Sequence, residues 1–144
     1  MNTSISISAT FPVAMPVVAW TIPVRSSMDF LTAEWCDTRF MEFRLGFPCL
    51  LAVAVVDVMA DALSAVYTFY DPDYQRRSLG KFAVLQEIAA ARAEQRQWLY
   101  LGYWIANCRK MRYKVDYQPL EYFWNGGWTA TRPRHAESAP SFED

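Results

Sequence analysis

The residues best suited to chemistry gather in one short stretch, where an aromatic run ends at Asp71-Pro72 and is followed by Arg76 and Arg77. A carboxylate in this position can hold an amine or accept a proton, and arginine binds carboxylates and phosphates through paired hydrogen bonds. The alternative is structural, because Asp-Pro often ends a strand and arginines often lie on solvated surfaces. The stretch therefore predicts either a polar site or an ordinary turn.

Positive charge is concentrated in the segment 76–114, although the whole chain has a net charge of −1. Nine lysines and arginines in this segment face only two acidic residues, Glu87 and Glu94, which leaves an excess of seven positive charges. Aromatic residues are interleaved with these cations, namely Tyr100, Tyr103, Trp104 and Tyr113. This combination favours contact with an anion or a nucleic acid over a merely solvated face.

The apolar periodicity predicts an α+β chain. Helices are expected over 26–37, 79–95 and 105–112, and strands over 39–45, 50–58, 62–70, 98–104 and 115–124. The inner stripe of the long helix is expected to be Phe82, Leu85, Ile88 and Ala89. Tyr67 and Tyr70 lie three positions apart, so they face opposite sides of their strand, and we expect at least one to be core.

This order of elements is typical of the GNAT acyltransferase fold, so the predicted fold is GNAT-like with a mixed sheet. The loop RRSLGK at 76–81 then stands at the start of the long helix, where free N–H groups attract phosphate. The loop has one glycine, Gly80, whereas an acetyl-CoA loop in this fold usually offers a pair, and it lacks the Walker spacing.

Cysteine and histidine usage excludes several kinds of site. Cys36, Cys49 and Cys108 form no CxxC pair, and the single histidine, His135, lies in a polar tail. We therefore expect free thiols in a reducing cytosol, no disulfide scaffold, no metal and no cofactor. Cys108 is expected to pack in the core, because no histidine is available to activate it as a nucleophile.

Four segments in this order resemble the C-terminal half of the aminoacyl-tRNA–protein transferases. They are LSAVYTFYDP (63–72), RRSLG (76–80), WLYLGYWI (98–105) and CRKMRYK (108–114). FLTAEW, EFRL and LLAVAVVDV are also similar to that family, so the likeness runs from about Met28 to Glu121. The likeness is strongest to the bacterial aspartate/glutamate leucyltransferase branch, which is related to eukaryotic arginyltransferase.

The resemblance implies a GNAT-like enzyme that uses aminoacyl-tRNA in place of acyl-CoA. It would transfer an amino acid, Leu or alternatively Arg, to the N-terminal amine of proteins that begin with Asp or Glu. Such proteins are then degraded through the N-end rule pathway in the cytoplasm. We expect residues 26–130 to form this domain, after an unmatched lead segment (1–25) and before a disordered polar tail (131–144). The lead is too short and too broken by prolines to span a membrane.

The resemblance and the charge pattern together predict the site residues. Asp71 and Tyr67 are expected to be catalytic, with Asp71 or a nearby tyrosine orienting the amine. The residues expected to bind tRNA or the acceptor are Arg76, Arg77, Ser78, Gly80, Lys81, Tyr103, Arg109, Lys110, Arg112 and Lys114. The expected partners are an aminoacyl-tRNA and a protein with an acidic N-terminal residue.

Two features depart from the family pattern. The paired cysteines that precede this half in family members do not occur in residues 1–27, and Ala62 stands where a glycine is common. One alternative is therefore a truncated, non-catalytic remnant that binds tRNA or acidic N-termini. Another is a small acyl-CoA acetyltransferase, which tight binding of CoA would support.

Overall fold

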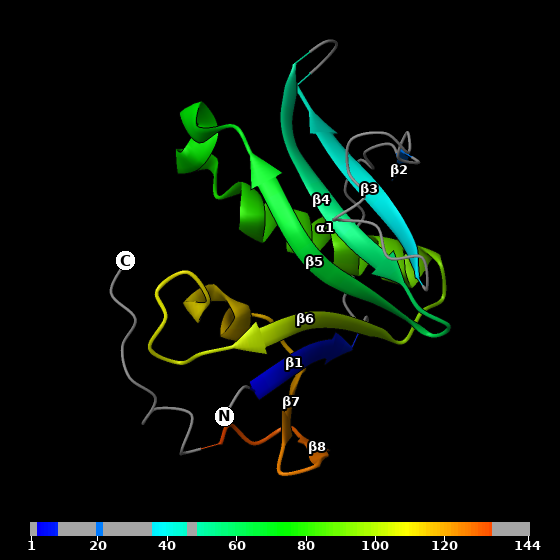
Figure 1. The fold of residues 1–144 in the computed structure, drawn as a ribbon, viewed down its shortest axis with the longest axis vertical. Helices are drawn as coiled ribbons and strands as arrows, with labels where there is room; N and C mark the ends of the chain where they lie inside the picture. Colours follow the sequence, from blue (N-terminus) through cyan, green and yellow to red (C-terminus); the bar gives the residue numbers. More distant parts are fainter. Residues whose placement is uncertain (1–2, 9–19, 22–35, 46–48, 134–144) are drawn as a thin grey trace.

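The computed structural model describes residues 3–8, 20–21, 36–45 and 49–133. In these residues, one eight-stranded sheet carries a single α-helix on one face (Figure 1). The predicted α+β class with a mixed sheet is confirmed. The helix expected over 26–37 falls almost entirely outside the described residues, as do most of the lead segment and the tail.

The strands of the sheet lie in the order β2-β3-β4-β5-β6-β1-β7-β8. Their bounds are β1 Thr3–Ser8, β2 Trp20–Thr21, β3 Asp37–Arg44, β4 Leu50–Val58, β5 Ala62–Tyr70, β6 Trp98–Trp104, β7 Leu120–Trp124 and β8 Gly127–Thr129. The strands expected over 50–58, 62–70 and 98–104 are confirmed with the same bounds. The strand expected over 39–45 is found at Asp37–Arg44.

The pairing between β5 and β6 is parallel, whereas every other neighbouring pair in the described sheet is antiparallel. It covers only three residue pairs, from Ala62 opposite Trp98 to Ser64 opposite Tyr100. Beyond this point the two strands diverge (Figure 1). A register shift on the other edge of β5 leaves Val66 unpaired with β4, which bends β5 further.

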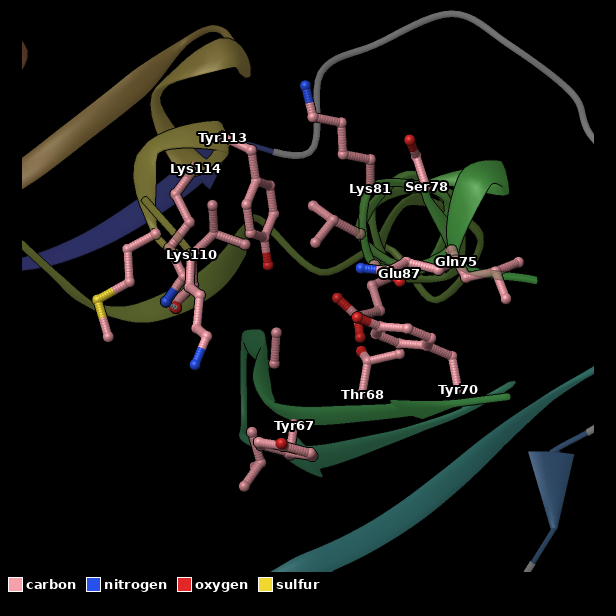
Figure 2. Close-up of a pocket in the computed structure, with 17 residues that line it drawn as sticks. Tyr67, Thr68, Tyr70, Gln75, Ser78, Lys81, Glu87, Lys110, Tyr113 and Lys114 are labelled. Atoms are coloured by element: carbon pink, nitrogen blue, oxygen red, sulfur yellow. Dashed lines mark hydrogen bonds between the residues drawn. The ribbon is translucent and has the colours of Figure 1, made fainter. Parts of the chain in front are cut away.

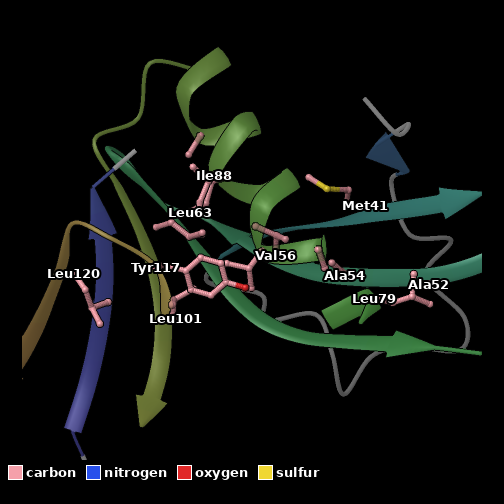
Figure 3. Packing of buried hydrophobic residues seen from close by; sticks show 14 of the residues in the cluster. Met41, Ala52, Ala54, Val56, Leu63, Leu79, Ile88, Leu101, Tyr117 and Leu120 are labelled. Carbon is pink, nitrogen blue, oxygen red and sulfur yellow. The ribbon is translucent and has the colours of Figure 1, made fainter. Parts of the chain in front are cut away.

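Helix α1, Leu79–Ala93, fills the angle behind the diverging strands and covers the core. Leu63 from β5, Ile88 from α1 and Leu101 from β6 belong to one buried cluster there (Figure 3). Burying such side chains stabilises the fold by about 1.5–3 kcal/mol each. The cluster therefore fixes the position of α1 against both strands.

The predicted inner stripe of α1 is only partly right. Ile88 is buried and Phe82 is half-buried against Phe43, with ring centroids 5.5 Å apart, but Leu85 is 48% exposed. The buried residues of the helix are instead Leu79, Ala83, Val84, Gln86, Glu87, Ile88 and Ala91. The prediction failed because two polar residues, Gln86 and Glu87, are buried in the middle of the helix.

The short helix expected over 105–112 is wrong. The segment makes a series of tight turns in which Cys108 N–H bonds to Ile105 and Met111 N–H bonds to Cys108, at 3.1 and 3.0 Å. A 3₁₀ helix, η2, follows at Arg112–Asp116, so the last long strand begins at Leu120 and not at 115. The apolar spacing of three residues fits three-residue turns better than an α-helix.

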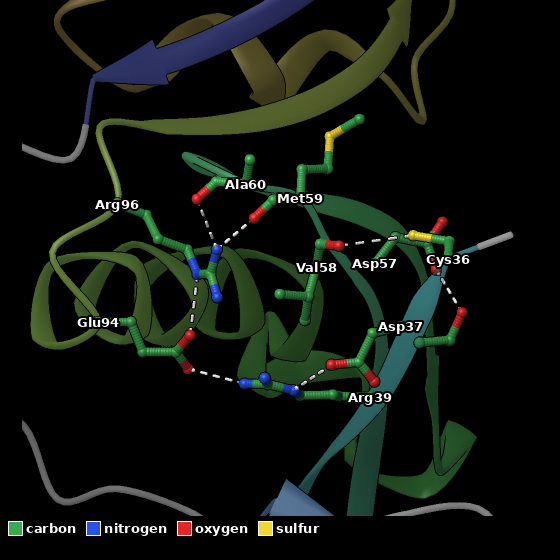
Figure 4. A network of polar contacts seen from close by, with 10 residues as sticks. Cys36, Asp37, Arg39, Asp57, Val58, Met59, Ala60, Glu94 and Arg96 are labelled. Carbon is green, nitrogen blue, oxygen red and sulfur yellow. Dashed lines mark hydrogen bonds and ion pairs between the residues drawn. The ribbon is translucent and has the colours of Figure 1, made fainter.

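A polar network connects the C-terminal end of α1 to strand β3 and to the turn between β4 and β5 (Figure 4). The Glu94 carboxylate forms ion pairs with Arg39 of β3 at 3.1 Å and with Arg96 at 2.9 Å. Arg96 also donates to the carbonyls of Met59 and Ala60 in the turn between β4 and β5. Arg96, one of the nine clustered cations, thus stabilises the fold at the opposite end of α1 from its N-terminus.

Candidate functional site

A cleft of about 660 Å³ opens where β5 and β6 diverge. Its walls are β5, the junction between the 3₁₀ helix η1 (Pro72–Arg77) and α1, and the turns and η2 that follow β6 (Figure 2). The three-residue pairing of β5 with β6 is therefore what creates the cleft, because longer pairing would close it.

Glu87 lies in the wall that α1 contributes, and it is the most unusual residue of the cleft. Glu87 is only 1% exposed to solvent, and its Oε2 atom has no hydrogen-bond partner in the part of the chain that the structure describes. Burial raises the pKa of the carboxyl from 4.5 to about 8, since the charged form loses its hydration. Glu87 is therefore largely protonated at neutral pH.

Hydroxyl groups surround the same space. Thr68 and Tyr70 of β5 point toward α1, and Tyr113 of η2 points in from the opposite side (Figure 2). Burial, and secondarily the charge of Glu87, raise the pKa of Tyr113. Tyr117 donates a 3.3 Å hydrogen bond to the carbonyl of Lys81, and its pKa is raised mainly by burial. Tyr113 and Tyr117 thus remain protonated and can act as hydrogen-bond donors.

Three lysines form the cationic part of the lining. Lys81 pairs with Asp116 at 2.7 Å, with half of its side chain exposed. Lys114 donates to the carbonyls of Leu101 and Tyr103 at 2.7 and 2.8 Å, and burial lowers its pKa. Lys110 reaches into the cleft from the turn before η2 (Figure 2). Lys114 therefore holds the turn against β6, while Lys81 and Lys110 supply charge at the opening.

The N-terminus of α1 also faces this opening. Ser78 adopts a left-handed backbone conformation with φ 53°, and within the described residues its side chain makes no capping hydrogen bond. The first turn of α1 contains no acidic residue, and a Cβ at Gly80 would meet open space. Uncapped N–H groups at a helix start favour an anion such as phosphate.

The cleft brings together half of the residues predicted for the site. Those that line it are Tyr67, Ser78, Gly80, Lys81, Lys110 and Lys114. Tyr67 is 58% exposed, its side chain points away from that of Tyr70, and it contacts Phe69 at a centroid distance of 4.7 Å. Tyr70 is itself 45% exposed, so the expectation that one of these tyrosines is core was wrong. β6 pairs with β5 only from Ala62 to Ser64, so it does not cover the end of β5 that holds the two tyrosines.

The other predicted site residues lie outside the cleft lining: Asp71, Arg76, Arg77, Tyr103, Arg109 and Arg112. Asp71 caps η1 by accepting a 3.0 Å hydrogen bond from the N–H of Asp73. Arg76 and Arg77 are exposed on η1, and the Arg77 guanidinium lies 5.6 Å from the centre of the Tyr74 ring. Asp71 remains a predicted catalytic residue, and the other five remain predicted contacts of tRNA or of the acceptor.

Glu87 was missed because it was counted only as one of two anions in a basic segment. A signal was available: Leu79, Ala83, Glu87 and Ala91 repeat every four residues, which places Glu87 on the buried face of the helix. In the described residues, no group of three or more histidine, cysteine, aspartate or glutamate side chains could hold a metal ion. No described helix has the length and apolar character needed to cross a membrane.

Residues 19–124, which include the walls of the cleft, match the family model described as arginine-tRNA-protein transferase, C terminus. The chain therefore belongs to this family. It is also similar to proteins named aspartate/glutamate leucyltransferase: 56% identical over 100 residues in Teredinibacter turnerae, and 52% and 57% over 101 residues in Alkalilimnicola ehrlichii and Pseudomonas aeruginosa. These matches cover 69–70% of this chain but only 41–43% of the curated relatives.

Proposed function

We propose that the chain transfers an amino acid, Leu or alternatively Arg, from aminoacyl-tRNA to the N-terminal amine of proteins that begin with Asp or Glu. The observation that carries this proposal is the cleft between β5 and β6, which combines a cationic opening, an uncapped helix N-terminus and a buried carboxyl. The relatives named aspartate/glutamate leucyltransferase support the choice of donor and acceptor.

The main task of the protein in this reaction is to align the acceptor amine with the aminoacyl ester. An aminoacyl ester is already activated, so the enzyme must bring an amine to its carbonyl carbon and remove a proton. Lys81, Lys110 and the start of α1 would hold phosphates of the tRNA or the acidic side chain of the acceptor. We place this reaction in a GNAT-like arrangement, in the cytoplasm, as a step that marks proteins for N-end rule degradation.

The test incubates the chain with tRNA charged with labelled leucine and a peptide that begins with Asp. A matched peptide that begins with Asn removes one charge at nearly constant shape, and arginyl-tRNA tests the other donor. The full-length relative from Teredinibacter turnerae serves as the reference reaction. Label transferred to the Asp peptide and not to the Asn peptide supports the proposal; no transfer while the relative is active contradicts it.

A second candidate is a non-catalytic domain that binds tRNA or acidic N-termini, and the cationic cleft opening beside an uncapped helix N-terminus favours it, because binding an anion there needs no catalytic group. Salt-sensitive tRNA binding without transfer in the same assay would support this function. The acetyltransferase alternative predicts tight CoA binding, which titration calorimetry with acetyl-CoA measures directly.

A further inference from the structure

The buried carboxyl of Glu87 has no evident use in holding the fold together. Its Oε2 atom is without a partner in the described residues, and none of the ion pairs found there includes it. Leaving a buried polar atom without a hydrogen-bond partner lowers the stability of the fold. Such a group facing a cleft calls for a ligand that supplies the missing donor.

The surroundings define the chemistry of that ligand. The titratable groups that face Glu87 are Tyr70 from β5 and Tyr113 and Tyr117 from the segment around η2, and Thr68 adds a further hydroxyl. Each of these side chains has a hydroxyl oxygen that can accept a hydrogen bond. Lys81 pairs with Asp116, and Lys114 donates to two backbone carbonyls, so neither is directed at the carboxyl. A primary ammonium group, with three donors and one positive charge, matches this set of acceptors.

We propose that Glu87 receives the N-terminal ammonium group of the acceptor protein and takes a proton from it. This inference rests on the proposed transfer function and assigns one residue to it. The separation of charge in the cleft supports it, because an acceptor that begins with Asp carries an ammonium group close to a carboxylate. The ammonium would enter toward Glu87, and the carboxylate would remain near Lys81 and Lys110 at the opening.

The proposed step balances as follows. When the ammonium binds, Glu87 releases its own proton to solvent, and its carboxylate then takes one proton from the ammonium, which leaves a neutral amine. The amine nitrogen forms a bond to the ester carbonyl carbon, and the bond from that carbon to the ribose oxygen of the tRNA breaks. The ribose oxygen keeps the electron pair and takes a proton that the nitrogen loses. Glu87 ends in the protonated state in which it began, so the reaction, counted with the proton released on binding, yields an amide, a tRNA hydroxyl and one proton.

The first test measures peptide binding without tRNA, so it does not depend on transfer. A peptide that begins with Asp is compared with the same peptide acetylated at its N-terminus, using wild-type protein, Glu87→Gln and Glu42→Gln. Glu42 pairs with Arg44 at 2.7 Å on β3, outside the cleft lining, and provides the same substitution as a control. We expect wild type and Glu42→Gln to bind the free amine at least 10-fold more tightly than the acetylated peptide. Glu87→Gln should lose this preference.

The second readout is the proton released on binding, measured by calorimetry at pH 7 in buffers of different ionisation enthalpy. Free Glu87 is largely protonated at this pH, and so is an α-amine with an ordinary pKa of about 7.7–8.0. Their pair shares one proton fewer than the separate groups, so wild type should release about one proton and Glu87→Gln almost none. If Glu87 had only a structural role, wild type and Glu87→Gln would release the same number of protons on binding.

Equal binding of free and acetylated peptides by wild type would overturn the inference, whatever the transfer assay shows. So would an undiminished preference in Glu87→Gln. In contrast, a clear preference for the free amine with no transfer of leucine would sustain the amine site and contradict the proposed function. If Glu87→Gln fails to fold, Glu87→Asp, which withdraws the carboxyl by one methylene, must weaken the preference for the inference to stand.

Discussion

Glu87 is the residue whose environment departs furthest from that of an ordinary carboxylate on a helix. Its folded pKa of about 8 lies above the 4.5 of the unfolded chain, so the unfolded chain loses this proton first as the pH rises. The contribution of protonated Glu87 to the free energy of unfolding is fully present below pH 4.5. It decreases between pH 4.5 and 8 and is lost above about pH 8. The amine site and the stability of the fold therefore make opposing demands on one side chain.

Replacing Glu87 with Gln should remove this pH dependence. Relative to wild type, we expect Glu87→Gln to become more stable as the pH rises from 4.5 to 8.5, by an amount on the order of 5 kcal/mol. Urea unfolding of both proteins at several pH values measures the difference. The same substitution at Glu42, which is paired with Arg44, is the control. A difference between Glu87→Gln and wild type that stays constant with pH would show that the carboxyl does not titrate with a raised pKa.

At the scale of elements, the start of α1 is the strongest candidate for contact with tRNA. The uncapped first turn and Lys81 lie at the cleft opening, while Arg92 near the other end of the helix is exposed and outside the cleft lining. Both residues carry one charge on the same helix. They therefore form a matched pair for separating a specific phosphate contact from the general attraction of a basic segment.

Lys81→Ala should weaken tRNA binding and reduce the slope of log K against log salt by about one, because one phosphate contact is lost. Arg92→Ala should change the slope much less. Filter binding or fluorescence anisotropy from 50 to 200 mM salt gives both slopes. Lys81→Ala also removes the exposed pair with Asp116, which contributes less than about 1 kcal/mol to stability. Equal slopes for the two variants would argue against a phosphate site at the helix start.

The elements also show what can be predicted from the sequence. The strands β4, β5 and β6 were located correctly because each is a continuous apolar or aromatic run bounded by turn residues. The segment 105–112 was mistaken for an α-helix because apolar residues at intervals of three fit both an α-helix and a series of three-residue turns. The cleft itself could not be predicted, since it depends on how few residues of β5 pair with β6, and pairing register is a tertiary property.

At the scale of the whole molecule, β1 holds the second half of the sheet together. It lies between β6 and β7 and pairs with both, so that Ser6 is opposite Tyr100 on one side and Glu121 on the other. From the sequence, these residues were expected to belong to an unmatched lead segment. The alternation of serine with Ile5 and Ile7 was a strand signal, but nothing local indicates which strands it would join.

A proline at Ser6 should test this bridging role, because proline cannot donate to a ladder and is excluded from central strands. We expect Ser6→Pro to lower the free energy of unfolding by about 1–3 kcal/mol, because a ladder hydrogen bond is lost and its acceptor is left without a partner. Ser6→Ala keeps the backbone donor and is the matched control, with a much smaller expected loss. Urea unfolding measures both variants. Equal stability of the two would mean that β1 is dispensable for the sheet.

The position of β1 also has a consequence for how the chain folds. Its pairing of Thr3 with Trp104 joins residues separated by roughly one hundred positions, and such long-range contacts slow folding because a large loop must close first. The antiparallel β3-β4-β5 meander has only short connections and is suited to form early. Until β1 is inserted, β6 and β7 each present an unpaired edge, which is a template for association with another chain. The refolding yield of this protein should therefore fall with protein concentration more steeply than its equilibrium stability alone suggests.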